Sequence, residues 1–121
     1  MSFEVLNKLA FALFAVLSGI LLFLPEVIFW LFGIEGSASS EFMMRRAAIL
    51  FMSLSVLAFV TSETENDEMR QVVSLTFAVA LLGMAAMGLF ELLRGDAGLG
   101  ILLAVVVEVI AGFYYIRFWR D

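Results

Sequence analysis

The chain has 121 residues, of which 64% are hydrophobic, and it contains no cysteine and no histidine. A soluble domain of this length has too little interior to bury so much apolar surface, so the bilayer must solvate most of it. The missing residue types exclude disulfides, thiolate or imidazole metal sites and histidine-dependent nucleophiles, and the formal net charge of −5 argues against a nucleic-acid partner.

The first apolar segment runs from about Val5 to Leu24, which is long enough to cross a bilayer as a helix. Pro25 ends it, because proline disfavours helical geometry at the residue before it. The run is longer than a signal-peptide core and lacks an Ala-x-Ala cleavage site, so we expect a permanent span. The apolar and aromatic piece at 26–33 is too short to cross and predicts a helix lying at the membrane interface.

Three further spans are predicted at about 42–62, 68–93 and 97–119. We expect Ser39 or Ser40 to cap the first of these three helices, since serine favours the N-cap position. The tight turn at 94–98 predicts that the last two spans are antiparallel neighbours. The predicted fold is therefore all-α, a four-helix transmembrane bundle with a short interfacial helix, in one integral membrane domain over residues 1–121.

Four spans place both chain termini on one side of the membrane. The basic residues divide almost evenly, with Lys8, Arg70, Arg117 and Arg120 on the terminal side and Arg45, Arg46 and Arg94 on the other. The small excess on the terminal side favours cytoplasmic termini under the positive-inside rule.

Glu108 lies near the middle of the fourth apolar segment. An ionisable side chain at that depth costs about 3 kcal/mol on insertion scales, so we expect an interaction that compensates for it. Steps of four residues place Glu108 in a row with Gly100, Ala104 and Gly112, and small residues mark faces where membrane helices approach closely. We therefore expect this row to be a helix-packing face, with Glu108 pointing into the bundle or into a subunit interface.

Three hydroxyl groups at similar depth are candidate hydrogen-bond partners for Glu108, namely those of Ser18, Ser53 and Ser55. Desolvation disfavours a charged carboxyl, so we expect a neutral, hydrogen-bonded acid unless a cation is near it. Two interpretations stay open at this point. Glu108 is either a structural polar contact that fixes helix packing or a group that binds a proton, a cation or another small ligand.

Arg45 and Arg46 lie where the second span enters the membrane, and Glu91 and Arg94 lie at the same end of the third span. Glu91 precedes Arg94 by three residues, a spacing that favours an ion pair along a helix. Paired arginines here are typical of interfacial anchoring by snorkelling. A second hypothesis is an anion or lipid-headgroup site, because guanidinium groups and the amides of a helix N-terminus supply donors.

No metal or other cofactor is predicted. The acidic loop at 61–68 lacks the glycine turn and the later glutamate that an EF-hand calcium site needs.

The layout of Pro25, Leu31-Phe-Gly-Ile34, Arg45-Arg-Ala-Ala48 and Glu108 resembles a group of uncharacterised bacterial small four-helix membrane proteins. This resemblance spans most of the chain and implies the same fold and a bacterial inner-membrane setting, without a function. The chain is also similar to the small multidrug resistance family in length, number of spans and charge balance. Members of that family work as dimers around an acid in the first helix, whereas the deep acid here is in the fourth span, so no residue roles carry over.

Three functions are compatible with these features. The first is a non-catalytic accessory, scaffold or assembly subunit that packs through small-residue faces against a second copy or a larger membrane complex. The second is binding or transport of a small molecule, lipid or ion through Glu108. The third, a lipid-modifying enzyme, ranks last because there is no histidine, cysteine or convincing acid pair to act as nucleophile or base. The sequence favours the first function slightly over the second, and we expect no enzymatic activity.

Overall fold

The computed structural model describes residues 1–121 as five helices: α1 (Phe3–Phe23), α2 (Pro25–Phe32), α3 (Ala38–Thr61), α4 (Asp67–Arg94) and α5 (Ile101–Arg120). The four helices other than α2 are long and apolar enough to cross a membrane. The predicted fold class is thus confirmed, an all-α chain with four candidate spans and a short helix after the first.

Polar caps set the helix boundaries. Ser37, not Ser39 or Ser40 as predicted, caps α3, and its hydroxyl accepts a hydrogen bond of 3.1 Å from the backbone N–H of Ser40. The helix begins at Ala38 instead of about Phe42, so both predicted caps lie inside its first turn. Serine is the residue type expected at the cap, but three serines lie close together here. The apolar pattern that was used to place the start of the helix begins only after all of them, so it did not indicate which serine is the cap.

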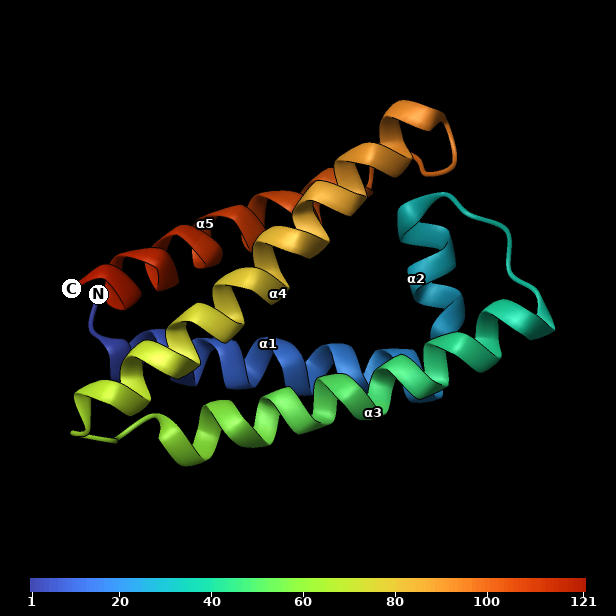
Figure 1. The fold of residues 1–121 in the computed structure, drawn as a ribbon. Coiled ribbons are helices and arrows are strands. Elements are labelled where there is room, and N and C mark those ends of the chain that lie inside the picture. Colours follow the sequence, from blue (N-terminus) through green and yellow to red (C-terminus); the bar gives the residue numbers. More distant parts are fainter.

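The four long helices pack as two antiparallel pairs, α1 with α3 and α4 with α5 (Figure 1). The predicted antiparallel arrangement of the last two spans is therefore confirmed. The two pairs meet at the end that carries both chain termini, and they diverge toward the end that carries α2 (Figure 1). The molecule is thus two helical pairs joined mainly at one end.

Aromatic side chains form the core where the two pairs meet. The ring centroids of Phe14 in α1 and Phe77 in α4 are 5.5 Å apart, and the ring of Phe77 lies 5.3 Å from that of Tyr115 in α5. All three side chains are completely buried. Such aromatic pairs contribute about 0.5–1.5 kcal/mol each beyond their buried area, so they stabilise the contact between the pairs.

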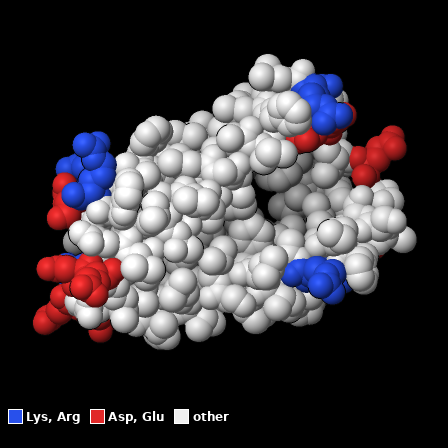
Figure 2. Space-filling view, viewed as in Figure 1, with Lys and Arg blue, Asp and Glu red and all other residues white.

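Charged side chains gather at the two ends of the molecule, with a belt of uncharged side chains between them (Figure 2). Large apolar side chains are exposed all along this belt, among them Val16, Phe59, Val79, Leu103 and Ile110. An exposed apolar belt between polar ends is what contact with lipid requires. The distribution supports a multi-pass membrane protein.

α2 runs crosswise to the spans and bridges their diverging ends (Figure 1). It ends at Gly33, whose backbone has a φ of 65°, and the N–H of Gly98 donates a hydrogen bond of 2.6 Å to the carbonyl of Phe32. Gly33 and Gly98 allow this close backbone approach, because a Cβ atom on Gly33 would lie 3.1 Å from the Gly98 Cα. The short helix thereby ties the α1–α3 pair to the turn between α4 and α5.

Candidate functional site

A cleft of about 270 Å³ opens on the α4–α5 pair, on the side that meets α2. Its lining residues are Phe32, Met84, Met87, Gly88, Glu91, Ile101, Val105 and Glu108. Figure 2 shows the molecule hollowed between the two helical pairs toward the α2 end. The cleft is therefore a consequence of the divergence of the pairs.

Helical periodicity explains why these side chains share the cleft. The lining positions on α4 follow the pattern i, i+3, i+4 and i+7, and those on α5 are spaced by four and three residues, so each set occupies one face of its helix. Gly88 lets the two helices approach, because a Cβ atom there would lie 3.0 Å from a methyl carbon of Val105. Glu91 lies near the end of α4, whereas Glu108 lies two turns into α5. One acid is thus near the membrane surface and the other is deeper.

Glu108 is half-buried, and its Oε2 atom is buried without any hydrogen-bond partner in the chain. More than nine in ten buried polar groups in proteins have a partner, so this exception needs an explanation. A buried group left unpaired costs about 1–3 kcal/mol, and more if it is charged. The Oε2 atom is thus a buried acceptor that no donor of the chain satisfies.

The three serines predicted to bond Glu108 lie on the other helical pair. Ser53 is exposed and donates to the carbonyl of Ile49 in its own helix at 3.1 Å. Ser55 donates to the carbonyl of Phe11 at 3.4 Å, which joins α3 to α1, and Ser18 is buried in α1. The expected grouping is therefore corrected: none of the three serines bonds Glu108, because α1 and α3 diverge from the α4–α5 pair toward the α2 end.

The row of small residues on α5 contacts two different elements. Gly112 is buried against α4, where a Cβ atom would lie 2.6 Å from the Leu82 side chain. Ala104 is half-buried. Gly100 precedes α5 and faces the backbone of Leu31 in α2, so it does not contact another span as the packing-face prediction had it. The difference arises because α5 begins at Ile101, later than predicted.

The predicted ion pair between Glu91 and Arg94 is not formed. Arg94 instead approaches Asp96, with 3.5 Å between Nε and Oδ2. Gly95, with a φ of 84°, reverses the chain directly after α4 and brings Asp96 within reach of the guanidinium. Glu91 has no ion-pair partner and lines the cleft.

Arg45 and Arg46 each interact with a side chain of their own helix. Arg45 lies 3.8 Å from the carboxylate of Glu41, and the Arg46 guanidinium lies 5.9 Å from the ring centroid of Phe42. Neither arginine forms an ion pair with the Glu91–Arg94 region. The contacts fit interfacial anchoring and do not assemble the anion site that the sequence suggested.

A buried hydrogen-bond cluster that sequence analysis missed lies where the two pairs meet. The Nδ2 atom of Asn7 donates to the Ala58 carbonyl at 3.0 Å and to Thr61 Oγ1 at 2.9 Å. The hydroxyl of Tyr115 donates to Asn7 Oδ1 at 2.6 Å. Asn7 therefore connects α1 to both α3 and α5, and its only signal in the sequence is an amide at the start of an apolar span.

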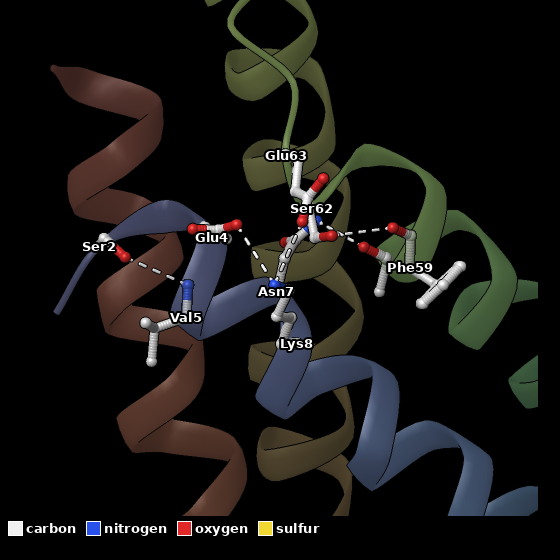
Figure 3. Close-up of polar contacts among 9 residues, drawn as sticks. Ser2, Glu4, Val5, Asn7, Lys8, Phe59, Ser62 and Glu63 are labelled. Atoms are coloured by element: carbon white, nitrogen blue, oxygen red, sulfur yellow. Dashed lines mark hydrogen bonds and ion pairs between the residues drawn. The ribbon is translucent and has the colours of Figure 1, made fainter.

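Beside this cluster, an exposed ion pair network joins α1 to the loop after α3 (Figure 3). The Lys8 ammonium lies 3.2 Å from the Glu4 carboxylate and 3.4 Å from that of Glu63. Exposed ion pairs of this kind contribute about 0–1 kcal/mol each. The buried cluster of Asn7 is neutral and fully hydrogen-bonded, so we assign it a structural role.

No protein-family model matches the chain, and no curated protein or solved structure is significantly similar to it. The resemblances noted in the sequence therefore stay predictions. The structure contains no group of three or more side chains that could hold a metal ion. What distinguishes the cleft is an apolar wall with two carboxyl groups, one from each helix of a pair.

Proposed function

We propose that this small multi-pass membrane protein binds or carries a small molecule, with the cleft on the α4–α5 pair as its binding site and Glu108 as the anchoring group. The observation that carries the proposal is made at Glu108, a residue that lines the cleft and whose Oε2 atom is buried without a hydrogen-bond partner. A bound molecule would supply the missing donor.

The composition of the cleft supports the same function. Small-molecule sites are concave and mostly apolar, with a few polar groups that orient the ligand. Here the aliphatic, methionine and phenylalanine walls surround two carboxyl groups. The cleft opens on the α4–α5 pair, whose outer surface carries exposed apolar side chains that suit lipid, so a ligand dissolved in the membrane has a route to it. The bacterial inner membrane with cytoplasmic termini stays our proposed location.

A scaffold or assembly function is the second candidate. A separate groove of about 340 Å³, lined only by hydrophobic residues, runs between α1 and α5. Its lining includes Leu6, Leu13, Val107 and Ile110. An apolar groove of this kind fits a helix of a second copy or of a larger membrane complex. A partner that also covered the α4–α5 cleft would be the source of a donor for Glu108.

A comparison of variants separates the two functions. The variant Glu108→Gln removes the charge with little change of shape, and Met87→Trp fills the cleft from a position that is 56% exposed. We expect both to reduce the amount of small molecule that remains bound when the protein is extracted from membranes and analysed by native mass spectrometry. Glu26→Gln, an exposed acid outside the cleft, is the matched control.

The oligomeric state of the same samples tests the scaffold function. If both cleft variants retain every bound small molecule while Glu108→Gln changes the mass of the assembly, the binding function is wrong and the scaffold function stands.

A further inference from the structure

We infer that the cleft takes an amphiphilic organic cation, a molecule with one ammonium group and a short apolar body. This inference rests on the proposed function, because it names the ligand class of the same cleft. It follows from the charges, the spacing of the two acids and the nature of the walls.

The charges of the lining residues all have one sign. Glu91 and Glu108 are the only ionisable residues in the cleft, and no lysine or arginine lines it. The nearest guanidinium along the chain, that of Arg94, is directed to Asp96 instead. A buried carboxyl without a counterion is unfavourable in either its charged or its unpaired form, and an anionic ligand would add repulsion. A cation with N–H donors resolves both problems at Glu108.

The spacing of the two acids argues against a metal ion. Glu108 lies seven residues into α5 from Ile101, about 10 Å along the helix axis at the usual helical rise. Glu91 lines the cleft near the opposite end of its wall, at the last turns of α4. Gly88 of α4 faces Ile101 and Val105, so Glu91, about one turn beyond Gly88, lies nearer the start of α5 than Glu108 does. No third ligating side chain joins either acid. A ligand that enters from the membrane surface would therefore meet Glu91 first and Glu108 afterwards, at greater depth.

The walls fit the apolar part of such a molecule. Met84 and Met87 supply flexible, polarisable side chains that adapt to an aliphatic body, and Val105 and Ile101 add branched apolar side chains to the lining. Phe32 of α2 closes the side nearest the membrane surface. The ammonium group is thus placed at Glu108, with the apolar body along the methionines.

Three probes with the same tail and different headgroups test this ligand class: octylammonium, octanol and octyl sulfate. The protein is placed in phosphatidylcholine nanodiscs with ¹³C-methyl-labelled methionine. Met84 and Met87 report on the cleft, while Met43 and Met52 on α3 lie outside it and report on partitioning into the lipid and on the fold. We expect saturable shifts of the two cleft methyl signals with octylammonium alone.

The variants sharpen the assignment. Glu108→Gln is expected to weaken octylammonium binding at least tenfold, Glu91→Gln by less, and the exposed control Glu26→Gln not at all. Glu108→Asp retains the charge and should recover part of the affinity. A change in the Met43 and Met52 signals of Glu108→Gln would indicate that this variant is misfolded. In that case Glu108→Asp and Glu91→Gln test the ligand class in its place.

The possible outcomes show separately whether the cleft is a binding site and whether its ligand is a cation. If octanol shifts Met84 and Met87 as strongly as octylammonium, and the acid variants change neither, the cation inference is overturned and the cleft remains a binding site. If none of the probes moves the cleft signals in the intact protein, the cation inference and the binding function both fail.

Discussion

Replacing Asn7 by alanine is expected to loosen the contact between the two helical pairs. Asn7 is completely buried, and its amide exchanges hydrogen bonds with the Ala58 carbonyl, the Thr61 hydroxyl and the Tyr115 hydroxyl. No other side chain in the chain forms hydrogen bonds to both pairs. The substitution therefore tests whether a neutral polar cluster, rather than apolar packing alone, fixes how the pairs meet.

The expected loss of stability follows from the hydrogen bonds that Asn7 and each of its partners lose. The two bonds donated by Asn7 are worth about 0.6 kcal/mol each on the average for interhelical bonds in membranes. Thr61 keeps its own bond to the Leu57 carbonyl at 2.6 Å, so it is not left unpaired. The Tyr115 hydroxyl is left unpaired in a fully buried position, at a cost of about 1–3 kcal/mol. We expect Asn7→Ala to lower the free energy of unfolding by about 2–4 kcal/mol.

The assay is equilibrium unfolding in mixed micelles, in which sodium dodecyl sulfate is titrated into dodecyl maltoside and helix content is followed by circular dichroism. Tyr115→Phe should cost about 1–3 kcal/mol, because the buried Asn7 Oδ1 loses its only partner while the two bonds donated by Nδ2 remain. The double variant should cost less than the sum, because the unpaired hydroxyl is gone. Ser53→Ala, an exposed hydroxyl bonded within its own helix, is the control.

Two results would refute this reasoning. One is a loss below about 0.5 kcal/mol for Asn7→Ala, which is the ordinary range for a surface substitution. The other is strict additivity of the two substitutions, which would mean that the amide and the hydroxyl do not interact.

The glycines of the second helical pair are expected to differ in their tolerance of a methyl group. Gly112→Ala would place a Cβ atom 2.6 Å from Leu82 and should cost about 1–3 kcal/mol in the micelle assay. Gly83→Ala meets nothing within 4 Å and should be neutral or stabilising; equal losses at both positions would contradict the packing account. Gly100→Ala would make its Cβ collide with the carbonyl oxygen of Leu31, so α2 should detach from the turn before α5. Faster amide exchange in α2, with the long helices still protected, is the expected sign, and unchanged protection would show that this contact does not hold α2.

The features of the fold that could be predicted from the sequence are those that depend on position along the chain. Hydropathy located the four spans, Pro25 marked the start of α2, and the tight turn after Arg94 gave the pairing of α4 with α5. These features are local, because a span is defined by its own side chains and a turn by a few residues.

Features that depend on which faces meet were not predicted. Ser53 and Ser55 have nearly the same depth, yet one points outward and the other contacts α1, because two residues on a helix face different directions. The sequence singles out Glu108 by its depth, but its surroundings depend on the divergence of the helical pairs. Asn7 escaped notice because its three partners lie far from it in the sequence.

The divergence of the pairs also gives the molecule a wedge-shaped outline, with α2 laid across its wide end (Figure 1). Such a shape occupies more area in one leaflet of the bilayer than in the other. Embedded in a membrane, the protein is expected to prefer regions where the leaflet around α2 is the expanded one. Its distribution between small and large vesicles of the same lipid, with the orientation fixed, would measure that preference, and an even distribution would show that lipid adapts to the wedge without cost.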